Sequence, residues 1–559
     1  MASRGLDDDT LQMLLDTFDS FAKKRLPLEK RLELDEKDQF PLELVKELLG
    51  PEIGMHLLFI PEEFGGLGGG AYDVYRVSEA MARVDLGVAT AFLAIFLGTD
   101  PIVVGATPEQ RAHWMRRIAD EGLMVAYAVT EPLAGSEVSA IRTKAERVVA
   151  DDGQAGYRLN GTKQFITNGG VAQLYSVLAM AEGGASFFLV EGGTAGVVAG
   201  KQENKHGIRS SNTTQVVFED VFVPTVNLVG GEEGKGLAHA QAVFGFTRLM
   251  VAAFGLGGGV AAMERAIRYA RERVQAGSPL ADKQAFTHKL IVPHLVRLEA
   301  ARAYVEETAR RLDAGEEDLT TEGAIAKLFA TEAGNAAADA AIQAHGGYGY
   351  TREYEVEKIR RDVRITTIYE GTSEILEWTI ARDRWRTHLQ GRGELYQKMA
   401  ASLEGLHLED PEVGADAAAL AMRALYQAIE RARIGRLTRN QHVLFRLGEM
   451  IARAETAGCL CRFAAGRGGP KYRPRFARSA LKAMARVCAR EAALYVLSSA
   501  IRWIGGCEPA TGAAGVAGVD GSAELARALA APSIYSACRG LVADMDLIAR
   551  AVVTEDQNE

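Results

Sequence analysis

One short stretch, residues 368–376, places a carboxylate where it can act as a base. Glu370 stands between a tyrosine and a glycine, just before a helical pattern of apolar residues that starts at Ile375. Thr372 or Ser373 can cap that helix, so Glu370 is predicted to lie on a loop that the helix holds rigidly. The ordinary alternative is a solvated glutamate near the positive end of a helix dipole. The segment alone favours this alternative, because short motifs are weak evidence.

Two strand-like runs end in a threonine beside small residues. Thr130 follows the run 124–129 and precedes a Gly135-Ser136 turn, and Thr167 ends the run 164–167. Such strand ends offer hydroxyls and closely approachable backbone N–H groups, as the polar edge of a planar ligand requires. The alternative is that both are ordinary strand-end threonines.

The elements that must position these residues change type along the chain. Helical spacing of apolar residues runs from about residue 7 to 120, and strand-like runs with turn signals follow to Gly231. Helical patterns return from about 236 to 388. They continue beyond about 391, where the composition shifts towards Ala and Arg. The predicted domains are 1–121, 122–235, 236–390 and 391–559.

The composition is that of an ordinary globular protein. The chain has 559 residues, enough for two to four domains. The net charge of −9 argues against nucleic acid as a main partner. The N-terminal residues lack the basic-then-apolar order of a signal peptide. No apolar run is expected to reach the length of a membrane span, so a cytoplasmic location is predicted.

The five cysteines all lie late in the chain and lack the spacing of a zinc site. They are Cys459, Cys461, Cys488, Cys507 and Cys538. An odd number without paired spacing predicts reduced thiols in a cytosol-like compartment. No metal site is predicted.

Five segments together carry a family resemblance. They are Tyr127–Glu137, Phe165–Gly170, Lys205–Ser211, Gln343–Tyr350 and Tyr369–Ile375. In their order and spacing they resemble the flavin-binding and C-terminal signatures of the acyl-CoA dehydrogenases. The resemblance covers about residues 7–390. One segment would be weak evidence, but five in register leave little room for chance.

The resemblance implies an α+β multidomain fold and FAD as the cofactor. The fold would comprise an N-terminal helical domain, a central β-barrel-like domain, a C-terminal four-helix bundle and an extra all-α domain. The residues implied to hold FAD are Tyr127, Val129, Thr130, Gly135, Ser136, Phe165, Thr167, Gly346, Thr372 and Glu374, with Arg273, Gln284, Gln343 and Gly347 from a neighbouring subunit. Thr167 would donate near the flavin N5, and Phe165 would form an apolar wall where the family usually has Trp. A guanidinium and backbone N–H groups suit the pyrophosphate.

The resemblance also implies the reaction, dehydrogenation of an acyl-CoA thioester to the trans-2-enoyl-CoA. Glu370 would remove an α-proton while the β-hydrogen leaves as hydride to the flavin, and its backbone N–H would bond the thioester oxygen. An apolar pocket should raise the pKa of Glu370 towards the working pH. The residues implied to contact substrate are Ser136, Arg248, Tyr369, Gly371 and Arg382. Arg382 is equally readable as a surface helix arginine.

The length of the acyl chain and the identity of the electron acceptor are inferred from fewer residues. On the helix 88–97, Ala89 and Leu93 would permit a long acyl tail, whereas Phe92 could block it. A long-chain substrate is expected, with electrons passed to an electron-transfer flavoprotein in fatty acid β-oxidation.

The residues after about 391 resemble the extra helical domain of very-long-chain acyl-CoA dehydrogenases, notably around 441–447. In that subfamily the domain occupies the surface that a second dimer would use, so a homodimer is expected. A basic stretch comprises Lys471, Arg473, Arg475, Arg478, Lys482, Arg486 and Arg490. It is readable as a peripheral membrane contact or as a solvated helix face with a basic loop.

Two other functions remain open. An acyl-CoA oxidase or nitroalkane-oxidase-like flavoenzyme would consume oxygen, although the latter uses Asp where this chain has Glu370. A non-catalytic relative acting as an assembly or scaffold protein would not be bleached by acyl-CoA.

Overall fold

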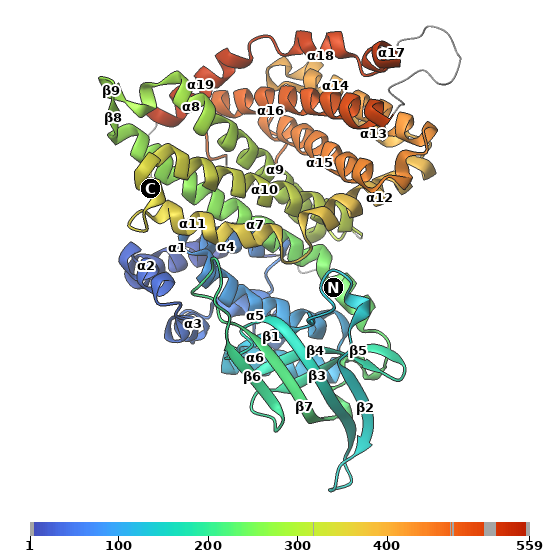
Figure 1. Cartoon of the computed structure of the whole chain (residues 1–559). Helices are drawn as coiled ribbons and strands as arrows, with labels where there is room; N and C mark the ends of the chain where they lie inside the picture. Colours follow the sequence, from blue (N-terminus) through green and yellow to red (C-terminus); the bar gives the residue numbers. More distant parts are fainter. Residues whose placement is uncertain (1–4, 317, 470, 472–473, 508–520, 555–559) are drawn as a thin grey trace. The chain divides into compact units, whose positions relative to one another are not determined.

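The chain forms two compact units, each described here by itself. The computed structural model describes residues 5–554 apart from 317, 470, 472–473 and 508–520 (Figure 1). The first unit comprises Met1–Gly258, Ala309–Glu317 and Arg352–Thr366. The second comprises Gly259–Thr308, Asp318–Thr351 and Thr367–Glu559. The four-part domain division stays a prediction.

Six helices open the first unit, as the apolar spacing predicts. They are α1 (Asp8–Arg25), α2 (Leu28–Glu36), α3 (Leu42–Leu49), α4 (Ala71–Val84), α5 (Leu86–Gly105) and α6 (Pro108–Glu121). Local capping fixes several starts: Asp85 accepts from the N–H of Val88 at α5, and Thr107 and Gln110 form a capping box at α6. The helix α5 is longer than the predicted 88–97.

The sheet of the first unit has seven strands. They are β1 (Val125–Ala128), β2 (Lys144–Val149), β3 (Ala155–Thr167), β4 (Leu174–Ala181), β5 (Gly184–Glu191), β6 (Val197–Gln202) and β7 (Thr213–Pro224). The order is β1-β4-β2-β3-β7-β6, with β5 paired to β4. The residues of strand β6 are mostly exposed and show no apolar alternation, so its sequence gives little signal for a strand. Aromatic and β-branched residues such as Tyr157, Phe188 and Phe218 form the core.

The second unit is helical, and two long helices run through both units. The helices are α7 (Gly236–Glu272), α8 (Gln284–Leu290), α9 (Val292–Asp313), α10 (Thr320–His345), α12 (Ser373–Gln390), α13 (Glu394–Glu409), α14 (Ala415–Ile434), α15 (Gln441–Ala464), α16 (Arg478–Ser499), α17 (Gly521–Ala528), α18 (Ala531–Ala537) and α19 (Leu541–Thr554); α7 and α9 are the two that cross. The helix α11 (Glu355–Val363) belongs to the first unit, and β8 (Val274–Gln275) pairs with β9 (Ser278–Pro279) in the second. Residues 510–521, whose glycine-rich and alanine-rich sequence predicts a loop, lie almost wholly outside the described residues.

Two helices, α5 and α7, have the length and hydropathy to cross a membrane, so the expectation that no apolar run is long enough was wrong. Their apolar windows are 83% and 100% buried within the protein, as in core helices.

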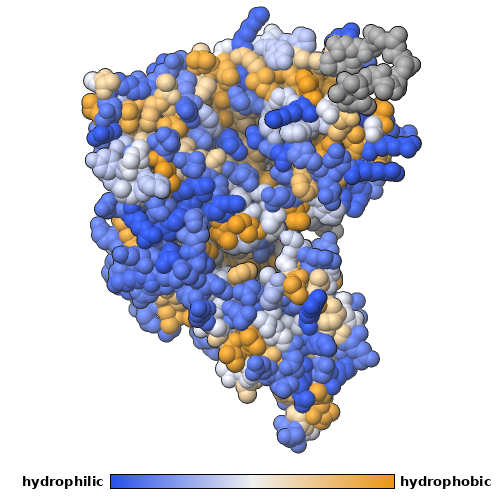
Figure 2. Space-filling model, viewed as in Figure 1, coloured by the Kyte–Doolittle hydropathy of each residue, from blue (hydrophilic) through white to orange (hydrophobic). Residues whose placement is uncertain are grey.

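On the face drawn in Figure 2, hydrophilic residues predominate and hydrophobic residues form small separate groups.

A buried polar cluster joins the C-terminal helices to the bundle of the second unit. Glu455 on α15 accepts both hydrogen bonds of a bidentate contact from Arg384 on α12, each at 2.8 Å. It also accepts from the hydroxyls of Tyr304 on α9 and Tyr396 on α13, each at 3.0 Å. Arg384 bonds Glu322 on α10 as well. Five helices therefore share one satisfied buried network.

Candidate active site

The end of β1 is held by a buried ion pair. Val129, the first residue after β1, is buried, and the next carbonyl, of Thr130, accepts from the N–H of Gln164 on β3 at 2.9 Å. Directly after it, Glu131 contacts the Nζ of Lys163 at 2.8 Å, and Lys163 is completely buried. Burial opposes ionisation of Glu131, but hydrogen bonds from Lys163 and Thr143 outweigh it and keep the carboxyl pKa below its ordinary value. The position of Thr130 is thereby fixed.

A β-bulge turns Phe165 outwards. The register of β3 against β7 shifts between Lys163 and Ile166. Phe165 lies in this shift with a φ of 58° and remains 64% exposed. A large aromatic side chain in the left-handed region is rare and costs free energy, and bulges often re-aim side chains next to active sites. The strain and the exposure point to a ligand that covers the ring.

The end of β3 is held by the turn that follows it. Thr167 pairs with Thr213 of β7. The next residue, Asn168, is buried at a φ of 61°, and its Nδ2 donates to the carbonyl of Ala91 on α5 at 2.8 Å. Among the described residues, neither Thr130 nor Thr167 has a side-chain hydrogen bond to protein. Both hydroxyls are therefore available to a ligand.

A buried carboxylate–ammonium cluster fixes the third resemblance segment within the first unit. Lys358 on α11 contacts Asp85 at 2.7 Å and Asp362 at 2.6 Å. Asp362 accepts the N–H of Ile208, which has a φ of 45°. Burial raises the pKa of Asp362 to about 6, although Lys358 opposes that rise. Loop 205–211 is thus tied to α5 and α11.

These features fit the flavin part of FAD. The ring needs hydrogen-bond donors at its polar edge and an apolar surface over one face. The threonine hydroxyls, which have no protein partner in the described part of the chain, and the exposed face of Phe165 are groups of these kinds. A Cβ added at Gly135 would meet no atom within 4 Å, so the backbone there is open to close approach. Ser136 is exposed, Tyr127 is half-buried, and its ring lies 5.7 Å from that of Phe187.

In the second unit, Glu370 sits on a tight turn at the start of α12. Thr372 caps the helix by accepting from the N–H of Ile375, as the sequence predicts. Glu370 has a φ of 55° and Gly371 a φ of 94°. A glutamate in the left-handed region costs about 1–2 kcal/mol, a strain that recurs at functional sites. The side chain is half-buried.

Two contacts from α10 hold this turn, and neither was foreseen. Lys327, which is completely buried, donates from Nζ to the carbonyl of Gly371 at 2.6 Å. The Oγ of Ser373 donates to Glu332 at 2.5 Å. The sequence does mark Lys327, because it stands within the apolar run 324–330 of α10. Burying a charge at such a position costs free energy unless the charge has a partner.

The residues assigned to the adenosine end of FAD lie together in the second unit. The guanidinium of Arg273 lies 5.9 Å from the ring centre of Tyr348, which follows Gln343, Gly346 and Gly347. A Cβ added at either glycine would meet no atom within 4 Å. Gln284 instead bonds Asp546 on α19 at 2.7 Å, so its amide already has a partner.

The remaining predicted residues have diverse surroundings. Arg248 on α7 is buried in the first unit. Arg382 stacks over Trp378 at 4.7 Å and pairs with Asp383, so it has partners on its own helix. Tyr369 is half-buried and Glu374 is exposed.

Comparison with known proteins identifies the family. Models for the N-terminal, middle and C-terminal domains of acyl-CoA dehydrogenases match residues 8–122, 126–221, and 234–384 with 399–512. An acyl-CoA dehydrogenase of Bacillus subtilis is 37% identical over 65% of this chain and 94% of its own. This chain belongs to the acyl-CoA dehydrogenase family. Like its members, it is an FAD-dependent oxidoreductase.

Other relatives of this acyl-CoA dehydrogenase extend the comparison. The caffeyl-CoA reductase–Etf complex subunit CarC of Acetobacterium woodii is 36% identical over 65% of this chain and 94% of its own. The structure of butyryl-CoA dehydrogenase from Megasphaera elsdenii is 36% identical, with a TM-score of 0.64, over 68% of this chain and 98% of that one. An acyl-CoA dehydrogenase from Bacillus anthracis, complexed with FAD, is 25% identical with a TM-score of 0.82, and covers 99% of this chain and 96% of that one. The three-domain architecture with extra C-terminal helices is therefore confirmed.

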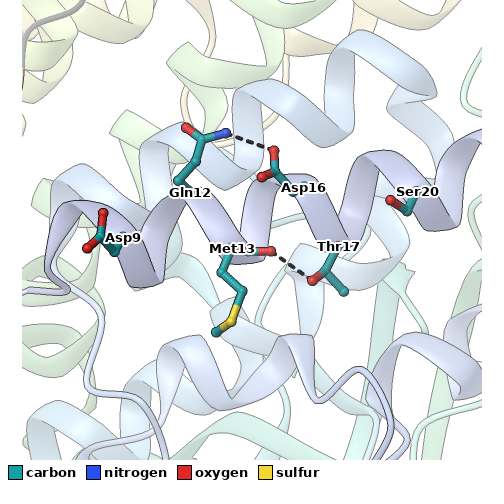
Figure 3. A pocket seen from close by; sticks show the side chains of 6 residues that line it. All are labelled: Asp9, Gln12, Met13, Asp16, Thr17 and Ser20. Carbon is teal, nitrogen blue, oxygen red and sulfur yellow. Dashed lines mark hydrogen bonds between the residues drawn. The ribbon is translucent and has the colours of Figure 1, made fainter.

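The chain also has a depression that none of these residues lines. A hollow open to solvent runs along one face of α1 and is lined by Asp9, Gln12, Met13, Asp16, Thr17 and Ser20 (Figure 3). Within the helix, the amide of Gln12 donates to Asp16 and the hydroxyl of Thr17 donates to the carbonyl of Met13. Among the described residues, no cluster of His, Cys, Asp or Glu is arranged to hold a metal ion.

Proposed function

We propose that the enzyme converts a long-chain acyl-CoA to the trans-2-enoyl-CoA, with Glu370 as the base. The observation that carries this proposal is the strained turn of Glu370 at the start of α12, held by α10. A carboxylate on a fixed turn can meet the α-carbon of a bound thioester without moving its backbone. Bound FAD would supply the acceptor for the β-hydrogen, which would leave as hydride.

The chain's own residues would bind, orient and deprotonate. Thr130 and Thr167 would donate hydrogen bonds to the flavin edge, and Phe165 would cover one face of the ring. The backbone N–H of Glu370 would stabilise the thioester oxygen as enolate character develops. Ser136, Arg248, Tyr369, Gly371 and Arg382 remain the proposed contacts to the acyl-CoA. Arg382 would have to exchange Asp383 for the substrate.

Substitution of the base tests this assignment. Glu370→Gln should retain FAD and acyl-CoA binding, while anaerobic flavin reduction by acyl-CoA slows by several orders of magnitude. Thr379→Ser, a conservative change on the same helix, is a matched control with wild-type rates. Near-normal reduction in Glu370→Gln would rule out Glu370 as the base.

The long-chain preference rests on α5. Ala89, Phe92 and Leu93 are completely buried, and the Phe92 ring lies 5.8 Å from that of Phe59. The Phe92 ring therefore packs against another aromatic side chain of the protein. Flavin reduction rates across saturated acyl-CoA thioesters of increasing length test the preference. Fastest reduction by butyryl-CoA, the substrate named for the Megasphaera relative, would overturn it.

We also propose an electron-transfer flavoprotein as acceptor, a role in fatty acid β-oxidation, a homodimer and a cytoplasmic location. The Acetobacterium relative, which is named as part of an Etf complex, supports the acceptor. Oxygen consumption compared with reduction of an electron-transfer flavoprotein separates dehydrogenase from oxidase. Light scattering on the holoenzyme tests the dimer, and cell fractionation tests the location.

The basic stretch is better explained as structural than as a membrane contact. Arg475 pairs with Glu264, Lys482 with Asp410, and Arg486 with Asp544. Arg490 also pairs with Asp544. Arg473 lies outside the described residues. We expect no flotation with anionic vesicles at physiological salt, because paired cations attract anionic lipids weakly. Flotation would restore the membrane contact.

A further inference from the structure

The turn that carries Glu370 needs support from outside its own helix. Glu370 and Gly371 both have positive φ values, and this backbone conformation is energetically unfavourable for a glutamate. The cap of α12 by Thr372 fixes only the helix side of the turn. A strained conformation persists only where the surrounding structure over-determines it.

Lys327 supplies this support from α10. Its side chain is completely buried, and its ammonium donates to the carbonyl of Gly371 at 2.6 Å. Burying an ammonium is costly unless it is hydrogen-bonded, so the contact is not an incidental surface bond. The residues around it on α10, such as Ala326 and Leu328, are also buried, so the ammonium has little freedom to leave.

A second contact lies beyond the turn. Ser373, the first residue of α12, donates to Glu332 of α10 at 2.5 Å. Lys327 therefore holds the turn itself, and Glu332 holds the helix start after it. Of these two contacts, the one from Lys327 brings a positive charge to the residue next to Glu370.

We propose that Lys327 is a positioning residue for Glu370, fixing the turn and favouring the ionised carboxylate. This inference rests on the proposed function. The ammonium contacts the residue adjacent to Glu370, which places it on the order of 10 Å or less from the carboxyl group. At that separation the Coulomb attraction of an ammonium favours the ionised form of a partly buried carboxyl group.

The test compares Lys327→Met with Lys327→Arg, both as holoenzymes. Lys327→Met should lower the rate of anaerobic flavin reduction at neutral pH by about tenfold or more, with KM little changed. The acid limb of its pH–rate profile should move to higher pH, because ionisation of Glu370 becomes harder. Lys327→Arg keeps the charge and should restore the acid limb. Backbone hydrogen exchange in a peptide spanning 365–376 should accelerate in Lys327→Met.

Two further variants separate positioning from stability. Glu322→Gln perturbs a buried contact of the same helix away from the turn, and should leave the pH profile and the 365–376 exchange unchanged. Ser373→Ala should accelerate exchange but leave the acid limb in place, because the ammonium remains. This variant keeps the test informative if Lys327→Met does not fold.

The outcomes distinguish the two claims. If Glu370→Gln abolishes reduction while Lys327→Met keeps the wild-type rate, pH profile and exchange, the positioning role is overturned and the base assignment stands. If Glu370→Gln retains reduction, the proposed function fails first.

Discussion

The Nζ of Lys163 lies 2.8 Å from Oε1 of Glu131, and both side chains are buried behind the end of β1. Lys163 also donates to the carbonyls of Val129 and Leu178. Glu131 accepts from Thr143 and from the N–H of Arg142. The pair thus ties four segments together directly beside Thr130, and burial lowers the pKa of Lys163 to about 8.

Breaking this pair should destabilise the first unit. Glu131→Leu leaves a buried ammonium without its carboxylate, and we expect a loss of about 3–5 kcal/mol. Thermal unfolding of the holoenzyme and its FAD content measure the loss. Glu394→Gln removes the exposed partner of Lys398 and should leave the unfolding temperature unchanged, because exposed ion pairs contribute little to stability. Equal effects of the two changes would contradict a special role for the buried pair.

Phe165 should matter for FAD and not for folding. Its ring is 64% exposed at a φ of 58°, so Phe165→Gly removes strain and no core contact. We expect FAD to bind more weakly, with no fall in the melting temperature of the apoprotein. Titration of apoprotein with FAD measures the binding. Phe165→Trp should bind FAD as the original does, and undiminished binding in Phe165→Gly would show that the ring covers no flavin.

The Glu455 cluster should be essential for the second unit. Glu455→Leu removes the acceptor of four hydrogen bonds and leaves Arg384 buried, which costs about 3–5 kcal/mol. Thermal unfolding of the holoenzyme should show a clear drop in midpoint. Glu404→Gln breaks an exposed pair with Arg423 between α13 and α14, and should have little effect.

Glu377 should make stability depend on pH. Burial is the main cause that raises its pKa from 4.5 to about 7, while Arg446 opposes the rise. Between these values the native state binds more protons than the unfolded state, so the free energy of unfolding falls as pH rises from about 4.5 to 7. Glu377→Gln should lessen this fall by up to about 3 kcal/mol. Denaturation at pH 5 and pH 7.5 measures the difference; parallel profiles for the two proteins would contradict it.

The sequence predicts features that depend on neighbours along the chain. The Thr372 cap, the strand ends at Thr130 and Thr167 and most helices are encoded by local residue types and spacing. The helix α13, in which Tyr396, Ala400 and Leu403 recur at helical spacing, lies in the region beyond about 391 where helical patterns are predicted to continue.

The supports of the site could not be predicted in the same way. The contacts of Lys163 with Glu131 and of Lys327 with Gly371 join residues 32 and 44 positions apart. Nothing in one sequence says which carboxylate or carbonyl a buried lysine will meet. The sequence does mark such lysines by their place in an otherwise apolar element, which is the signal to follow.

The Arg384–Glu455 contact has a practical consequence for anyone who shortens this chain to the length of its smaller relatives. A truncation after residue 390 would delete Glu455 together with α15. The guanidinium of Arg384 would then lose its carboxylate, and the helix faces that α15 covers would be exposed. Arg384 and the hydroxyl of Tyr304 would then lose their shared buried acceptor and meet water instead.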